Sequence, residues 1–397
     1  MTPLLVSART LSTCLGRGVA ETIAGLRAQR SGLQRCTFET TDLDTWIGEV
    51  AGVDEQRMPR DLAYYDCRNN RLAQLALETD GFADEVRAAI ARYGPARVGV
   101  FLGTSTAGIL QTELAYRRRD AQSGALPDDF NYRSTHNPFS LAEFVRDFFG
   151  LGGPAVAIST ACSSSAKAFA AGMRQIACGT VDAAVVGGVD SLCLTTLYGF
   201  ASLQLTSRFP CRPYDAVRDG ISVAEGAAFV LLERLPAHMP TLGVQFLGCG
   251  ESSDAYHMSS PHPQGLGARL AMTSALHAAG IAPAAIDYIN LHGTATVAND
   301  EAEGRAVAAL FGRSVPCSST KGATGHTLGA AGAVEAVICV LSLEQGLRPG
   351  SPQTQTPDPA IAIGYCLHSQ AQPLRRVLSN SFGFGGSNCS LIFGFSS

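Results

Sequence analysis

Short apolar runs alternate with longer helix-like segments along most of the chain. Four of the apolar runs look like buried strands: Val98–Leu102, Ala155–Ile158, Ala183–Val186 and Ala227–Leu232. Four longer segments predict helices: Ala166–Ala177, Arg269–Ala279, Glu301–Phe311 and Ala330–Glu344. Such alternation is typical of βαβ units. It predicts an α/β fold with mostly parallel sheets covered by helices.

Two parts of the chain share this rhythm. Residues 154–190 run strand, turn, small-residue helix and strand, and residues 286–340 contain two further strand-like runs, each followed by a turn and a helix. Between them, Leu235–Pro240 carries two prolines and is the best candidate for a junction. We therefore expect two similar halves, residues 1–235 and 236–397.

Composition and charge narrow the class of protein. Of 397 residues, 46% are apolar and 16% charged, which is typical of a globular protein with a large core. The net charge of −4 gives no overall attraction to nucleic acid or anionic lipid. Because neither a signal peptide nor a long apolar run is evident, we expect a cytoplasmic protein that binds no nucleic acid and no membrane. The twelve cysteines lack zinc-site spacing, so no metal site is predicted from them.

A cysteine lies where a predicted strand turns into a helix. Cys162 follows the run at 155–158 and precedes the small-residue helix that begins near Ala166. Free N–H groups and the dipole at a helix N-terminus favour a thiolate, and small neighbours leave the sulfur open. This placement predicts a nucleophile. An inert core cysteine would show the same local pattern.

Two histidines occupy similar places in the second half. His292 ends an apolar strand-like run, and His326 lies in a glycine-rich turn that opens a long apolar helix. Catalytic groups of α/β folds often lie where a strand meets a turn, although turn hydrogen bonds could equally satisfy either ring. The glycine-rich run does not match a phosphate-binding loop, because its lysine comes first.

Lysine is rare in this chain. Of 30 Lys and Arg residues, only Lys167 and Lys321 are lysines. Lys321 lies five residues before His326, at the start of the same turn. Lysine presents a compact ammonium, whereas arginine needs a broad planar site, so a specific requirement for Lys321 is indicated. A second glycine-rich turn, at residues 379–388, could direct a backbone N–H at a developing oxyanion.

Together these segments resemble the elongating β-ketoacyl-acyl-carrier-protein synthases of the thiolase-like superfamily. The matching stretches are TACSSS, NLHGTAT with DEAE downstream, KGATGHTLGAAGAVE and NSFGFGGSN, and RPYDAVRDGISVAEGAA also matches the family's segment between the halves. Their order and spacing agree over roughly residues 95–395. The resemblance implies a five-layered α-β-α-β-α fold of two duplicated halves.

The resemblance also implies catalytic roles. Cys162 matches the nucleophile that takes an acyl group from a thioester. His292 and His326 match the pair that assists decarboxylation of a malonyl thioester and stabilises the enolate. Lys321 matches the catalytic-site lysine, and Glu303 the carboxylate that is its partner. The implied reaction is a decarboxylative condensation, which needs no metal or redox cofactor.

Further positions match the family's binding sites. The N–H groups of Cys162 and Phe384 match the oxyanion hole, and Phe384 also resembles the gate to the acyl pocket. Thr294 and Thr296 match threonines that hydrogen-bond the pantetheine arm. Thr106 and Phe382 are assigned to the substrate pocket. Thr106 falls near the position that often limits the length of the acyl pocket in the family. Four residues resemble a structural cation site of some members: Asn290, Glu335, Ser379 and Asn388.

Some features depart from the family pattern. The usual T-P-x-G-D after the first histidine motif reads TVAND from Thr296 to Asp300, and ACSSS is more similar to polyketide synthases than to fatty-acid synthases. The resemblance therefore leaves two pathways open, which are polyketide or aryl-polyene assembly and ordinary fatty-acid elongation. A coenzyme A thiolase is a further alternative, but it would need a second catalytic cysteine where this chain has FGFGG.

The resemblance implies an acidic acyl carrier protein as partner. Three consecutive arginines could bind this partner: Arg117, Arg118 and Arg119. An ordinary solvated helix face would show the same run of charges. Arg208 is a lesser candidate. Family members are usually dimers, so a homodimer is expected. A heterodimer with a chain-length-factor subunit, in which this chain is the active half, stays open because its nucleophile and both histidines are intact.

Overall fold

The computed structural model describes residues 2–235 and 243–395. The expected junction at 235–240 lies almost wholly outside the described residues. A single twelve-stranded sheet runs through both halves, with the short β2 (Gly16–Arg17) attached to β1. The other strands follow in spatial order: β14 (Gly364–Tyr365), β12 (Pro316–Ser318), β11 (Tyr288–Asn290), β16 (Arg376–Gly383), β17 (Ser387–Gly394), β10 (Gln245–Ser253), β1 (Leu4–Thr13), β9 (Gly226–Arg234), β7 (Ala183–Asp190), β5 (Val98–Gly103) and β6 (Ala155–Ile158).

The strand order repeats in the two halves. The first half reads β6-β5-β7-β9-β1 and the second β12-β11-β16-β17-β10, so each uses its own strands in the order third, second, fourth, fifth and first. β1 pairs with β10 and joins the halves. The chain therefore has the thiolase-like fold of two duplicated halves, and the duplication lies in the topology.

The strands are mixed rather than mostly parallel. β5 runs parallel to β6 and β7, and β11 runs parallel to β12 and β16, as expected for βαβ units. The edge strand β14 is also parallel, to β12, whereas β1, β9, β10 and β17 pair antiparallel with their neighbours. β16 and β17 show why, because only a short turn joins them, and a parallel pair would need a long crossover. The prediction of mostly parallel sheets was therefore wrong for this part of each half.

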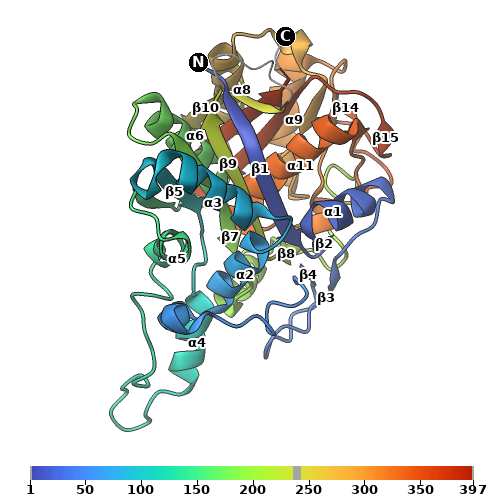
Figure 1. Cartoon of the computed structure of the whole chain (residues 1–397). Helices are drawn as coiled ribbons and strands as arrows, with labels where there is room; N and C mark the ends of the chain where they lie inside the picture. The colour runs from blue at the N-terminus through green and yellow to red at the C-terminus, as the bar shows by residue number, and fades with distance from the viewer. Residues whose placement is uncertain (1, 236–242, 396–397) are drawn as a thin grey trace.

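The helices form three layers around the strands of the two halves, which belong to the one continuous sheet (Figure 1). α6 (Ser164–Ala177) and α11 (Ala331–Gln345) lie in the middle layer, where both contact strands of both halves. α8 (Leu266–Ala279) and α9 (Val297–Phe311) cover the second half. The first half is covered by α2 (Arg68–Leu77), α3 (Phe82–Tyr93) and α5 (Phe139–Phe149). The four predicted helices are confirmed with small shifts of their ends.

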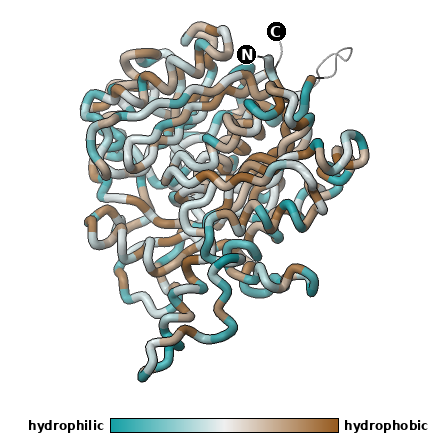
Figure 2. Tube along the Cα trace, turned by 90° about the vertical axis from the view of Figure 1, so that its left-hand side faces the viewer, coloured by the Kyte–Doolittle hydropathy of each residue, from teal (hydrophilic) through white to brown (hydrophobic). Residues whose placement is uncertain are grey.

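The other elements lie around this framework: α1 (Gly18–Arg27), α4 (Ile109–Arg117), α7 (Leu194–Ser202), α10 (Lys321–Thr324), β3 (Gln34–Arg35), β4 (Trp46–Gly48), β8 (Val223–Ala224), β13 (Leu347–Arg348) and β15 (Gln370–Ala371). The chain after α4 projects from the lower end of the molecule (Figure 1). Figure 2 shows hydrophobic residues gathered along the central elements.

α11 is the most apolar helix of the core. Every residue from Ala331 to Leu343 is buried. By length and hydropathy the segment Leu328–Gln345 could cross a membrane, but 89% of it is buried inside the protein. It therefore has the character of a core helix.

Small residues bring α6 close to the sheet. A Cβ at Gly172 would lie 2.5 Å from a Val186 methyl carbon, and one at Gly103 would lie 2.2 Å from the Ser165 amide nitrogen. The end of β5 therefore contacts the start of α6 directly. This close packing fixes the position of the turn that carries Cys162.

Candidate active site

Cys162 lies on a strained turn two residues before α6. Ala161 has a φ of 53°, a left-handed conformation that non-glycine residues rarely adopt. The Ser164 hydroxyl accepts a hydrogen bond from the Thr160 amide at 2.8 Å and donates one to the Ala161 carbonyl at 2.5 Å. These bonds hold the strained turn, as is common for residues that aim a catalytic group. The predicted placement of Cys162 at a strand–helix turn is confirmed.

Burial dominates the electrostatics of the Cys162 sulfur. Burial raises the pKa of the thiol to about 11, against the lowering effects of the Lys321 ammonium and the backbone N–H groups of Phe384 and Cys162. The sulfur is thus a thiol at neutral pH. The helix position alone does not produce the thiolate that the sequence pattern favoured, because desolvation of the charged form costs more.

His292 is buried directly after β11. Its Nδ1 lies 3.4 Å from Lys321 Nζ, and an ammonium can only donate. Nδ1 is therefore an acceptor, and the ring proton is on Nε2. Burial first, and then the charge of Lys321 and the neighbouring His326, hold the pKa of His292 well below its usual range. The ring is neutral at pH 7.

His326 has the same tautomer for a different reason. Its Nδ1 accepts the Leu328 amide at 3.2 Å, which places its proton on Nε2 as well. Leu328 adopts a left-handed φ of 51° to make this turn. Burial, followed by the charge of Lys321, holds the pKa of His326 well below its usual range. A neutral ring with one N–H is the result.

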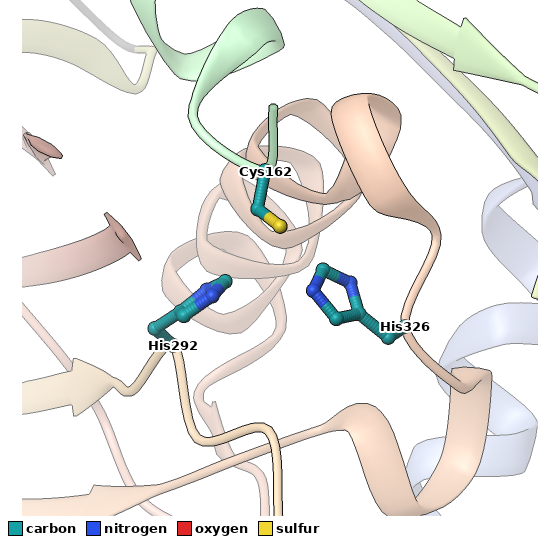
Figure 3. Close-up of side chains that lie close together, drawn as sticks. All are labelled: Cys162, His292 and His326. Carbon is teal, nitrogen blue, oxygen red and sulfur yellow. The ribbon is translucent and has the colours of Figure 1, made fainter. Parts of the chain in front are cut away.

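The three side chains converge from separate segments (Figure 3). The two imidazole rings are 5.3 Å apart between centroids and nearly perpendicular. The sulfur and one nitrogen of each ring all lie within 4.8 Å of one another. Such spacing could also hold a metal ion, but the nearby ammonium of Lys321 opposes a cation there. The arrangement instead presents two N–H donors beside a nucleophile.

The partner of Lys321 differs from the expected one. Its ammonium forms an ion pair with Glu335 of α11 and donates to the His292 carbonyl at 2.5 Å. Burial raises the pKa of Glu335 to about 7, and Lys321 opposes that rise. The assignment of Glu303 as partner was wrong. Glu335 itself could have indicated a buried ion pair from the sequence, because a carboxylate in an otherwise apolar helix needs a buried partner.

Glu303 supports the turn that carries His292. Its carboxylate accepts the amides of His292 and Gly293, both at 2.8 Å. It also accepts the Tyr214 hydroxyl and the Asn380 side-chain amide, both at 3.0 Å. Glu303 is therefore a positioning residue. Tyr214 and Asn380 were not predicted from the sequence, because their role depends on contacts between distant segments.

The C-terminal glycine-rich turn reaches Cys162. Phe384 begins the short turn between β16 and β17, and its N–H interacts with the Cys162 sulfur. A Cβ at Gly383 would lie 2.8 Å from the Thr160 carbonyl oxygen, so a glycine is needed for this approach. The Phe384 ring contacts Phe200 at 5.9 Å between centroids. The expected pair of N–H groups thus lies at the sulfur.

A cavity of about 340 Å³ opens onto the three side chains. The two predicted threonines, Thr294 and Thr296, line this cavity, and their hydroxyl oxygens are 2.9 Å apart. Phe382 lines it as well and packs against the His292 ring at 6.0 Å. Thr106 does not line it, because its hydroxyl and amide are both bound to buried Asp190. The expected role of Thr106 in limiting the length of the acyl pocket stays a prediction.

The predicted arginines lie in two different places. Arg117 and Arg118 end α4 and already form ion pairs with Glu39 and Asp129. Arg119 follows them and is exposed. Arg208 lies beside the cavity, where its amide donates to the lining residue Asp219 at 3.3 Å.

Part of the resemblance to a structural cation site has a counterpart in the structure. Asn290 Oδ1 and Glu335 Oε2 are buried without a hydrogen-bond partner among the described residues. Ser379 is the strand partner of Asn290. Asn388 instead donates its amide to Asp254 at 2.9 Å. Unpaired buried oxygens could bind a small cation, but the ammonium of Lys321, which is already paired with Glu335, opposes one there, so the cation site stays a prediction.

Comparisons with known proteins agree with this geometry. The family models described as "Beta-ketoacyl synthase, N-terminal domain" and "Beta-ketoacyl synthase, C-terminal domain" match residues 6–238 and 244–355. A 3-oxoacyl-[acyl-carrier-protein] synthase 2 of Vibrio cholerae is 31% identical, with 98% of each chain covered. A mitochondrial 3-oxoacyl-[acyl-carrier-protein] synthase of Arabidopsis thaliana is 38% identical, and that match spans 57% of its length.

Solved structures show the same likeness. The ketosynthase ApeO of Xenorhabdus doucetiae, in complex with its chain length factor ApeC, has a TM-score of 0.90 and is 38% identical, covering 100% of this chain and 98% of that one. A β-ketoacyl synthase of Burkholderia phymatum has a TM-score of 0.88 and is 31% identical, with both chains fully covered.

Proposed function

Because the chain belongs to the β-ketoacyl synthase family of condensing acyltransferases, we propose that it condenses an acyl group held on Cys162 with a malonyl-acyl carrier protein. One observation carries the proposal. Cys162 and the two N–H-bearing imidazoles meet at the cavity, which suits a reaction that needs a nucleophile and two donors to one oxygen.

The first half-reaction loads the enzyme. The Cys162 sulfur attacks the carbonyl carbon of an acyl thioester, and the N–H groups of Cys162 and Phe384 stabilise the oxyanion. The bond between the acyl carbon and the carrier sulfur then breaks. The carrier leaves as a thiol with the proton that the Cys162 thiol has lost, so the acyl group is transferred with no net change in protons.

The second half-reaction forms the carbon–carbon bond. The Nε2–H groups of His292 and His326 donate to the thioester oxygen of the malonyl group. Loss of CO2 leaves an enolate, whose carbon attacks the acyl thioester on Cys162. The carbon–sulfur bond breaks, and the thiolate takes up one proton. The product is a β-ketoacyl carrier two carbons longer, and its formation needs no redox cofactor.

Lys321 keeps both imidazoles in the required state. Its ammonium can only donate to His292 Nδ1, and its charge disfavours protonation of either ring. Neutral rings with a proton on Nε2 are donors that do not protonate the carbanion. A thiolase that uses coenzyme A is disfavoured, because Cys162 is the one cysteine among the described residues that line the cavity.

The proposal includes assembly and location. We propose a homodimer, with a heterodimer with a chain-length-factor subunit as the alternative that ApeO exemplifies. The edge strand β6 supports a dimer, because its four apolar residues are all partly exposed and offer a surface on which a second subunit can pack. Light scattering of the purified chain alone decides between the assemblies, since a homodimer has twice the chain mass of 41.5 kDa.

We also propose a cytoplasmic location, supported by the burial of the segment Leu328–Gln345 inside the protein.

A substrate panel tests the activity. The protein is incubated with acyl carriers of different chain length and with malonyl carrier, and both proteins are followed by intact mass. We expect acylation of Cys162 and a two-carbon extension. Chain-length and aryl preferences in the panel assign the pathway to fatty-acid elongation or to polyketide or aryl-polyene assembly. Condensation by a Cys162→Ala variant would overturn the mechanism.

A further inference from the structure

The mouth of the cavity carries a loop that the reaction does not use. We infer that this rim loop, residues 207–212, is where the carrier protein docks, with Phe209 as its apolar anchor and Arg208 as its contact to acidic side chains. The inference rests on the proposed function and deepens it. It moves the docking site away from the three arginines at the end of α4.

Hydrogen bonds fix the rim loop to the cavity wall. The Ser207 hydroxyl donates to Asp219 at 2.6 Å and accepts the Phe209 amide at 3.1 Å. The Ser207 amide donates to the Ile221 carbonyl at 2.8 Å. Asp219 and Ile221 both line the cavity. A partner bound to this loop would thus lie at the entrance through which its prosthetic arm must pass.

Phe209 has the character of an interface anchor. Its side chain is 55% exposed, which is unusual for a phenylalanine in a rigid loop. The Arg212 guanidinium lies over its ring, 5.1 Å from the centroid, and holds it in place. Aromatic side chains that are already ordered lose little entropy on binding, and they recur among the residues that dominate binding energy.

The charges favour the rim loop over the arginines of α4. Arg208 is exposed and makes no ion pair within residues 2–235 and 243–395. Arg117 and Arg118 would have to break their ion pairs with Glu39 and Asp129 to bind an acidic partner. Arg208 therefore offers an acidic surface a free cation, next to an apolar contact.

Kinetics with carrier-bound and carrier-free substrates test the docking site. Phe209→Ser and Arg208→Ala are compared with the unchanged protein, using malonyl carrier and malonyl N-acetylcysteamine thioester. We expect each substitution to raise the KM for the carrier substrate at least about tenfold, which corresponds to ~1.4 kcal/mol. The carrier-free reaction should not change, and Phe209→Leu should recover much of the loss.

Two further variants complete this test. Arg87→Ala removes an exposed cation of α3 and should have no effect. The triple replacement of Arg117, Arg118 and Arg119 by alanine should leave the carrier KM unchanged, whereas a rise confined to that variant would overturn the inference. Equal losses with both substrates would also overturn it. If the unchanged protein condenses neither substrate, the proposed function itself fails.

A second inference comes from a buried carboxylate that no catalytic role uses. Asp190, at the end of β7, accepts the Gly329 amide at 2.5 Å with Oδ2. Its Oδ1 accepts the amides of Ser105 and Thr106 and the hydroxyls of Thr104 and Thr106, at 2.7 to 2.9 Å. We propose that Asp190 is a positioning residue for His326.

The strained turn after His326 needs such an anchor. His326 is oriented by the Leu328 amide, which reaches it only because Leu328 adopts a left-handed φ of 51°. The next residue, Gly329, is the one tied to Asp190. Asp190 thus holds the turn in its strained form from the side of the first half, while residues 222–224 hold the His326 backbone.

Asp190→Asn tests this role. An asparagine that keeps the bonds at Oδ1 places an NH2 group against the Gly329 N–H and loses that contact. We expect decarboxylation of malonyl carrier to fall about 100-fold, the cost of a misplaced catalytic group. Acylation of Cys162 does not use His326 and should not fall, because loss of the Asp190 charge removes one contribution that raises the pKa of the Cys162 thiol. Equal losses in both steps, or no loss in decarboxylation, would overturn the proposal.

Thr104→Val provides the matched variant. It removes one donor to Oδ1 of Asp190 but leaves the Gly329 contact in place. We expect decarboxylation to stay near the level of the unchanged protein. A loss as large as that of Asp190→Asn would show that the packing around the carboxylate, rather than the tie to Gly329, sets the rate.

Discussion

The reactivity of Cys162 results from two opposing effects, desolvation of its sulfur and the nearby positive charge and N–H groups. Desolvation is the larger, and it raises the pKa of the thiol to about 11. At neutral pH the sulfur is therefore mostly in its less reactive thiol form. This protects the sulfur from unwanted alkylation and oxidation, which need the thiolate.

Alkylation of Cys162 should consequently depend steeply on pH. Below a raised pKa the thiolate fraction grows about tenfold per pH unit, so the rate with iodoacetamide should rise about 100-fold between about pH 7 and 9. Peptide mass mapping follows Cys162, and exposed Cys178 reports reagent access. A rate for Cys162 that levels off below about pH 9 would contradict the raised pKa.

Lys321 should control the protonation of both histidines. In Lys321→Met the charge that lowers the pKa of His292 and His326 is gone, so both pKa values should rise. As the pH falls, protonation then begins at a higher pH than in the unchanged protein. NMR titration of labelled histidine measures this directly, and unchanged or lower midpoints would refute the assigned role of Lys321.

At the scale of elements, the site depends on turns held by residues far away in the sequence. Strand–turn–helix order predicted where Cys162, His292 and His326 lie, because each follows an apolar strand or opens a helix. The tautomers and the identity of the partner of Glu335 could not be predicted, since they depend on how α9, α10 and α11 pack. The sequence indicated only that Glu335, in an apolar helix, needs some buried partner. Glu303 was assigned as the partner of Lys321 from its family position, and that assignment was wrong for the same reason.

Glu303 offers a test of the support given by α9. Glu303→Gln replaces one acceptor oxygen by an NH2 group that faces N–H donors. The protein should lose about 1–3 kcal/mol of unfolding free energy, and condensation should fall as the His292 turn shifts. Urea unfolding and turnover are measured beside Glu301→Gln, which changes a half-buried carboxylate of the same helix that pairs with Arg305 and Arg218. Equal behaviour of the two variants would count against the role of Glu303.

The turn between β16 and β17 should be equally sensitive. In Gly383→Ala the new methyl group meets the Thr160 carbonyl at 2.8 Å and pushes the Phe384 N–H away from the sulfur. Loss of one oxyanion donor lowers turnover about 100-fold or more. Gly199→Ala, where a Cβ meets nothing within 4 Å, is the control. Full activity of Gly383→Ala would exclude the Phe384 N–H from the oxyanion hole.

At the scale of the whole molecule, the duplication places the active site. The first half contributes α6, a helix rich in small residues, to the middle layer, and the second half contributes the apolar helix α11. Cys162 lies two residues before α6, His326 lies five residues before α11, and the His292 ring lies beside that of His326. The sequence rhythm indicated two halves and α/β elements correctly. The antiparallel strands β1, β9, β10 and β17 were not distinguished from parallel ones, because buried strands of either kind are continuous apolar runs.

The most direct test of the central claim is a single turnover with labelled malonyl carrier. Protein that has been acylated on Cys162 is mixed with malonyl carrier bearing 13C at the central carbon, and CO2, protein and product are measured together. We predict one CO2 released for each acyl group lost from Cys162, and a product two carbons longer that carries the label. Transfer of the acyl group without CO2 release, or product formation with the acyl group still on Cys162, would contradict the account.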